Sequence, residues 1–157
     1  MNNPTKRSIK RLSITILILG GLSVAFTYVQ MFSQIGGNHI NSINWNPDIR
    51  GWQIAIIAGR FIGIALLYAM CCIFLFRINR GLENGEIFPK SNISLIRWTA
   101  LVTVLLTFVQ SNFDAVVKGE SALMLDSNTF LIPLIVLLFA GIYKMAYLAA
   151  KDSNLAI

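Results

Sequence analysis

Charged side chains are scarce in this chain. Of its 157 residues, 13% are charged and 55% are hydrophobic, whereas soluble domains carry roughly 25% charged residues. Seven acidic and thirteen basic residues cannot cover the surface of a soluble domain of this length. The net charge of +6 does not indicate direct binding to nucleic acid, because no basic stripe with interleaved aromatic residues is present.

Residues that carry catalysis or bind metals are equally few. The single histidine, His39, lies among asparagines, and the only cysteines, Cys71 and Cys72, are adjacent in an apolar run. A metal site needs a cluster of His, Cys, Asp or Glu, and a nucleophile needs a base beside it. Neighbouring cysteines rarely satisfy disulfide geometry, and no glycine-rich phosphate loop with its lysine occurs. We therefore expect a protein that is not an enzyme and that carries no cofactor or metal.

Long apolar runs dominate what is present. A helix needs about 20 apolar residues to cross roughly 30 Å of hydrocarbon, and four runs are long enough to qualify. They cover approximately residues 14–32, 54–76, 98–114 and 130–148. The sequence therefore predicts a single all-α membrane domain, built as a bundle of four transmembrane helices.

The first run has a competing interpretation. Basic residues precede it, and Ser23-Val24-Ala25 resembles the small-residue cleavage site of a secretory signal. The apolar character continues past Ala25 to Phe32, which favours a retained span. N-terminal sequencing of the purified protein would distinguish the two.

Basic residues concentrate beside the ends of the apolar runs and predict the orientation of the helices. With a cytoplasmic N-terminus, the cytoplasmic side holds ten of the thirteen lysines and arginines, namely Lys6, Arg7, Lys10, Arg11, Arg77, Arg80, Lys90, Arg97, Lys144 and Lys151. The other three are Arg50, Lys118 and the membrane-embedded Arg60. Because short cytoplasmic loops carry an excess of basic residues, we predict a multi-pass protein of the cell membrane with both termini in the cytoplasm.

Polar and small side chains recur at helical spacing within three of the runs. The positions are Gly20, Ser23, Thr27, Gln30 and Gln34 in the first run, Ala55, Gly59 and Gly63 in the second, and Thr99, Thr103, Thr107 and Ser111 in the third. Polar side chains within lipid belong at contacts between helices. We therefore expect these three faces to turn inward in one bundle.

Arg60 is charged although it lies within an apolar run. At 1.5 Å per residue, its Cα and that of Asp114 each lie about 24 Å from the inner edge of their runs. The shared depth predicts an ion pair, with Asp126 as the alternative partner, because an unpaired arginine at that depth is costly unless it snorkels to the interface.

These polar residues of the outer half predict a small pocket. Its candidate members are Gln30, Gln34, Arg60, Gln110, Ser111, Asp114 and Asn128. Such a pocket could hold an anionic ligand or a lipid headgroup through Arg60. The alternative is that the same side chains only pack the helices together.

The segment between the second and third runs, residues 77–97, is predicted to be a cytoplasmic loop. Gly81 can end the second helix, Asn84-Gly85 is typical of a tight turn, and Asn92 can cap the next helix. The loop is either a well-defined turn with an apolar foot in the membrane interface or a contact surface for a soluble partner. The candidate contact residues are Arg80, Glu83, Asn84, Gly85, Glu86, Phe88, Asn92 and Arg97.

This loop also carries a family resemblance. The stretch from Glu83 to Phe88, followed by Asn92 and by Leu95-Ile96-Arg97, resembles the central signature of a bacterial family known as domain of unknown function 2975. The resemblance implies a small protein of four spans, and its residue-level part is confined to this loop. Members of that family are often encoded beside a small helix-turn-helix regulator, which implies such a regulator as a cytoplasmic partner. The family has no established activity that could be carried over.

Two functions remain. The first is a non-enzymatic regulatory or accessory membrane protein, which senses an external or membrane signal and contacts a cytoplasmic transcriptional regulator. The alternative is a small transporter or channel subunit that acts as an oligomer. The intramembrane charges lie in one leaflet only, which favours the first.

Overall fold

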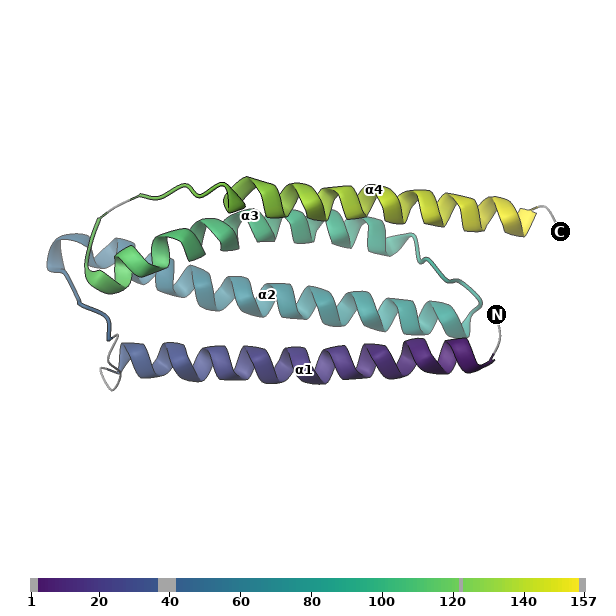
Figure 1. Cartoon of the computed structure of the whole chain (residues 1–157), viewed down its shortest axis with the longest axis horizontal. Helices are drawn as coiled ribbons and strands as arrows, with labels where there is room; N and C mark the ends of the chain where they lie inside the picture. The colour runs from purple at the N-terminus through teal and green to yellow at the C-terminus, as the bar shows by residue number, and fades with distance from the viewer. Residues whose placement is uncertain (1–2, 37–41, 122, 156–157) are drawn as a thin grey trace.

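The computed structural model describes residues 3–36, 42–121 and 123–155, and the regular structure in these residues is helical (Figure 1). Helix α1 spans Asn3–Ile35, α2 spans Arg50–Glu83, α3 spans Ser91–Lys118 and α4 spans Asn128–Leu155, and a short 3-10 helix, η1, spans Pro47–Ile49. Each of the four long helices is long and apolar enough to cross a membrane. The all-α class is therefore confirmed, and so are four long apolar helices at the predicted positions.

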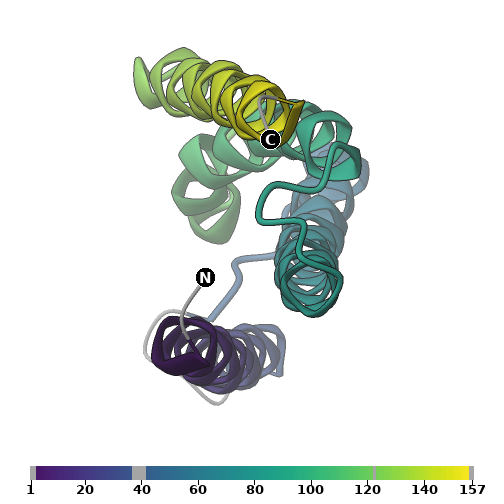
Figure 2. The same ribbon diagram turned by 90° about the vertical axis from the view of Figure 1, so that its right-hand side faces the viewer.

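The long helices lie side by side in chain order. Helix α1 packs against α2, α2 against α3 and α3 against α4, and within the described residues no other pair of long helices is in close backbone contact. Seen along the helices, they form an open arc with α1 and α4 at its two ends (Figure 2). The predicted bundle is thus open, so the three polar faces do not meet around one centre.

The molecule has two ends, a turn end and a loop end. The turn end holds residues 3–11, 77–92 and 144–155, so α1 begins and α4 finishes at the same end (Figure 1). The loop end holds residues 30–36, 42–60, 112–121 and 123–128. At the turn end, α2 continues to Glu83 and α3 begins at Ser91. Only residues 84–90 of the predicted 77–97 loop therefore lie outside the helices, and they form what we call the 84–90 turn.

Local chemistry explains where the helices begin and end. The Asn46 side chain accepts a hydrogen bond from the Asp48 N–H (3.0 Å), which caps η1 ahead of Pro47. Gly119 has a φ of 79°, and its N–H donates to the Val116 carbonyl (3.1 Å). This left-handed residue ends α3 in the way that glycine commonly does.

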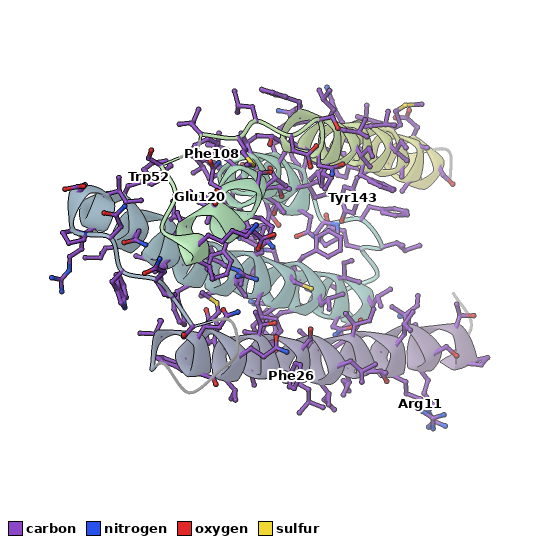
Figure 3. The ribbon with its side chains drawn as sticks, turned by 60° about the vertical axis from the view of Figure 1, so that its left-hand side comes forward. Arg11, Phe26, Trp52, Phe108, Glu120 and Tyr143 are labelled. Carbon is purple, nitrogen blue, oxygen red and sulfur yellow. The ribbon has the colours of Figure 1, made fainter. Side chains whose placement is uncertain are left out.

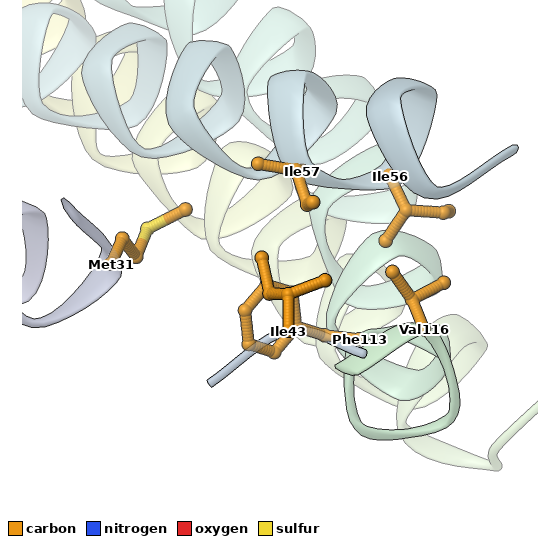
Figure 4. Packing of buried hydrophobic residues seen from close by; sticks show 6 residues of the cluster. All are labelled: Met31, Ile43, Ile56, Ile57, Phe113 and Val116. Atoms are coloured by element: carbon orange, nitrogen blue, oxygen red, sulfur yellow. The ribbon is translucent and has the colours of Figure 1, made fainter. Parts of the chain in front are cut away.

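Apolar side chains cover the outside of the molecule. Leu22, Phe26 and Val29 of α1 are 63%, 64% and 66% exposed, and Phe26 projects away from the other helices (Figure 3). Water would not tolerate such a surface, but lipid tails would. The buried apolar core is small and lies at the loop end, where α1, α2, α3 and the segment before η1 converge (Figure 4). It consists of Met31, Ile43, Ile56, Ile57, Phe113 and Val116.

Candidate functional site

The predicted outer pocket is only partly assembled at the loop end. Gln34 and Asp114 line a common hollow of about 580 Å³, together with Asn44, Phe113 and Lys118. The other predicted members lie outside this hollow. Gln30 and Gln110 are exposed, which places them on the lipid-facing or solvent-facing surface.

The predicted ion pair of Arg60 is not formed. Within the described residues the one ion pair is Lys10–Glu83, and the Arg60 guanidinium instead lies over the Phe113 ring, 3.8 Å from its centroid. Neighbouring residues on a helix point about 100° apart. Phe113 therefore faces α2 while Asp114 is exposed, and the arginine meets the ring in a cation–π contact.

The alternative partner, Asp126, is engaged locally. Its carboxylate accepts hydrogen bonds from the Ser127 hydroxyl (3.1 Å) and from Asn128 Nδ2 (2.9 Å). These hydrogen bonds hold the pKa of Asp126 below its usual value. Asp126 and Asn128 thus organise the start of α4 rather than a pocket with Arg60.

The hydroxyl ladder of α3 is satisfied within its own helix. Thr103 and Thr107 donate to the carbonyls four residues earlier (2.8 Å each), and Ser111 donates to the Thr107 carbonyl (2.9 Å). The Thr107 hydroxyl also reaches the Thr129 carbonyl of α4 (3.5 Å), and the Thr99 hydroxyl lies 3.4 Å from Met70 Sδ of α2. The predicted face of α3 therefore does turn toward its neighbours, although its shorter hydrogen bonds stay within the helix.

Three fully buried amides do join the elements, and the sequence pattern did not single out their role. Gln53 is 0% exposed; its Nε2 donates to the carbonyls of Asn44 (2.8 Å) and Val116 (2.9 Å), and its Oε1 accepts from the Asn46 N–H (3.0 Å). This one side chain ties the segment before η1 to the ends of α2 and α3. In the sequence, the one sign of this role is that Gln53 is a single polar residue beside Trp52 at the start of an apolar run.

Asn112 makes the same kind of tie between α3 and the segment that follows it. It is 0% exposed, its Nδ2 donates to the carbonyls of Phe108 (2.8 Å) and Met124 (2.9 Å), and its Oδ1 accepts from the Met124 N–H (2.8 Å). The asparagine directly follows Ser111 in the predicted polar stripe, but it lies one position off that face.

The predicted contact loop is compact at the turn end. The Glu86 N–H donates to the Gly81 carbonyl (2.8 Å), and a Cβ at Gly81 would lie 2.5 Å from the Glu86 carbonyl oxygen. Gly85 has a φ of 81°, as a tight turn of this kind requires. Of the candidate contact residues, Arg80, Glu83, Asn84, Gly85, Glu86 and Arg97 are exposed, Phe88 is half-buried and Asn92 is buried.

Tyr143 of α4 joins this turn to the helices beneath it. Its hydroxyl donates to the Pro89 carbonyl (3.4 Å) and accepts from Asn92 Nδ2 (3.2 Å). Its ring meets Phe88 edge-on, with centroids 5.5 Å apart, and lies 5.9 Å from the Phe74 ring. Asn92 is 0% exposed, which shows that it belongs to this internal contact. Neither Tyr143 nor the burial of Asn92 could be read from spacing, because the partners are 51 residues apart.

The same tyrosine lines an apolar cavity of about 400 Å³ between α2, α3 and α4. Its wall includes Cys71, Phe74, Phe88, Leu95, Phe139 and Tyr143. The volume falls in the range of about 300–1,000 Å³ that small-molecule sites occupy, and the lining suits a hydrocarbon chain or another apolar molecule. Two aromatic side chains therefore connect the cavity with the 84–90 turn: Phe88, which belongs to the turn, and Tyr143 of α4, which contacts it.

Among the described residues, no three His, Cys, Asp or Glu side chains are grouped so that they could hold a metal ion. Cys71 and Cys72 are both free thiols. His39 lies outside the described residues.

Comparison with known proteins gives no relative for this chain. No family model, no curated protein and no solved structure matches it. The resemblance of residues 83–97 to domain of unknown function 2975 therefore stays a prediction from the sequence.

Proposed function

We propose that this chain is a non-enzymatic regulatory protein of the cell membrane, with both termini in the cytoplasm. In this proposal an apolar molecule within the bilayer enters the cavity between α2, α3 and α4. The mobility of the 84–90 turn changes in response, and the turn contacts a cytoplasmic helix-turn-helix regulator.

The observation that carries the proposal is the double role of Tyr143. Its side chain lines the cavity, while its hydroxyl contacts Pro89 and Asn92 and its ring packs against Phe88. A molecule that displaces the ring must disturb the turn, because packed side chains have few alternative positions. The exposed residues Glu83, Asn84 and Glu86 give the turn a polar surface for a partner.

Filling the cavity by mutation tests the coupling without knowledge of the ligand. A spin label at Glu86→Cys, in a Cys71→Ala/Cys72→Ala background, reports the mobility of the turn. Ala146→Phe places a ring in the cavity wall and should change that mobility. Ala149→Phe adds the same ring at an exposed position of the same helix and should leave it unchanged. An equal response in both variants would overturn the coupling.

The partner is tested separately by crosslinking. A photo-crosslinking residue at Glu86 in native membranes, followed by mass spectrometry, should recover a helix-turn-helix regulator. The same residue placed at the exposed Glu120 of the loop end should not. Recovery from neither position, combined with solute flux through the purified protein in liposomes, would replace the regulatory function with transport.

A further inference from the structure

A second hollow lies at the turn end, between the beginning of α1 and the end of α2. Its volume is about 620 Å³, and its lining includes Lys6, Arg7, Lys10, Arg11, Asn79 and Glu83. Leu82, which is 4% exposed, also contributes to the lining. The hollow is separate from the apolar cavity, which α2, α3, α4 and the 84–90 turn line.

Positive charge exceeds negative charge in this hollow. Lys10 pairs with Glu83, with Nζ and Oε1 2.6 Å apart. Among the described residues, Lys6, Arg7 and Arg11 form no ion pair. Arg11 projects away from α2 (Figure 3), so it contributes to the rim. Lys6 and Arg7 are therefore the cations available to an anionic group inside.

Asn79 adds an unsatisfied acceptor to the residues that line the hollow. Its Oδ1 is buried and accepts no hydrogen bond within the described part of the chain. A buried acceptor without a donor is unfavourable, and a hydroxyl group on a bound molecule would satisfy it. The basic bias that orients helices requires cations at this end, but it requires neither a hollow nor an acceptor that lacks a donor.

The position of the hollow fits the boundary between water and hydrocarbon. Lys6 and Arg7 precede the first predicted span, 14–32, and Asn79 follows the second, 54–76. We propose that the hollow binds the headgroup of an anionic phospholipid that carries free hydroxyls, of the phosphoglycerol type. Lys6 and Arg7 bind the phosphate, Asn79 Oδ1 accepts from a headgroup hydroxyl, and the acyl chains lie along the apolar surfaces of α1 and α2.

Native mass spectrometry of the full-length protein with equimolar phosphatidylglycerol and phosphatidylcholine tests this site. We expect phosphatidylglycerol to be retained preferentially, and Lys6→Gln/Arg7→Gln to lower that preference about thirtyfold, the scale expected for two basic residues beside anionic lipid. The control Lys144→Gln/Lys151→Gln removes two positive charges from exposed positions of the same end and should retain the preference.

Three results would overturn the assignment. An equal loss in both double variants would show general attraction between a basic end and acidic lipid. The absence of any preference in the unmodified protein would show that no such site exists. Displacement of the lipid by excess inorganic phosphate would assign the site to a soluble phosphate instead of a lipid.

Asn79→Leu tests the hydroxyl contact specifically. The substitution removes the buried acceptor, so the lipid-free protein should unfold at a higher temperature. The preference for phosphatidylglycerol over phosphatidic acid, which lacks the headgroup hydroxyls, should fall in the same variant. If both quantities stay unchanged, Asn79 takes no part in headgroup binding.

Discussion

Helix α1 is attached to the molecule in a different way from the other three helices. Fully buried amides tie α2, α3 and α4 to each other and to their connecting segments through Gln53, Asn92 and Asn112. In α1, no described residue is a buried amide. Instead, α1 meets α2 through the tyrosine hydroxyls of Tyr28 and Tyr68, which donate to the carbonyls of Phe61 (2.7 Å) and Leu17 (2.9 Å).

The two kinds of contact differ in which groups are left without a hydrogen-bond partner when the side chain is removed. Gln53 and Asn112 each bind several groups at once, including main-chain groups of the connecting segments, and loss of either amide leaves those groups unpaired. A tyrosine hydroxyl that reaches a helix carbonyl adds one bond to an acceptor that the helix already uses. We infer that α2, α3 and α4 form the stable unit, whereas α1 is the element that can separate. The proposed lipid site lies at this weaker junction, and the proposed regulatory cavity lies within the stable unit.

The largest effect should come from Gln53→Leu at the loop end. Leucine leaves the Asn44 carbonyl and the Asn46 N–H without their partner, which should cost about 2–3 kcal/mol of unfolding free energy. Reversible unfolding in mixed micelles with increasing dodecyl sulfate measures the change. Gln30→Leu makes the same substitution at an exposed position of α1 and should change the value by less than about 0.5 kcal/mol. If both variants lost a similar amount of unfolding free energy, buried amides would not hold α2, α3 and α4 together more strongly than α1 is held.

The number and placement of the helices could be predicted from the sequence because apolar length is a local property. The spans 54–76 and 98–114 lie within α2 and α3, although both helices extend further into the 77–97 segment. Spacing also found Gln34 and Asp114, which do line one hollow. These predictions were correct because they need only the position of a residue along its own helix. That position also gives the depth of the residue in the membrane, which follows from counting residues.

What could not be predicted depends on how each helix is rotated against its neighbour. Arg60 and Asp114 share a depth, but Phe113 occupies the face that meets the guanidinium. Asn92 is predicted to cap α3, but it lies within that helix and is buried against Tyr143. Inward faces were expected to meet around one centre, yet the helices form an open arc (Figure 2). The spacing of residues along the sequence shows which side chains share one face of a helix. It does not show which neighbouring helix packs against that face.

A smaller effect is expected from Tyr68→Phe at the junction of α1 and α2. Loss of the bond to the Leu17 carbonyl should cost about 1 kcal/mol and should widen the distribution of distances between α1 and α2. Pairs of spin labels, one on α1 and one on α2, measure that distribution, and a pair on α2 and α3 should not change. Tyr147→Phe serves as the control, because Tyr147 belongs to α4, which makes no close backbone contact with the described parts of α1 or α2. An equal widening between α2 and α3 would show that α1 is no more separable than the rest.

The smallest effect is a pH dependence of the same junction at the turn end. The hydrogen bond and positive charge of Lys10 lower the pKa of Glu83, so the pair stabilises the contact fully above the ordinary glutamate pKa of about 4.3. That contribution is lost as the pH falls through the lowered value in the folded protein. Both side chains are more than half exposed, at 54% and 63%, which limits the effect.

Spin labels at Thr5 and Asn84, in micelles without acidic lipid, should therefore show α1 moving away from the end of α2 only in acid. Glu83→Gln should abolish the transition and leave the wider distance at every pH, because the neutral amide no longer attracts the Lys10 ammonium. Glu86→Gln removes a carboxylate from the neighbouring turn and should keep the transition. A transition that survives in Glu83→Gln would have to arise from another group, and the Lys10–Glu83 pair would then have no part in holding α1 in place.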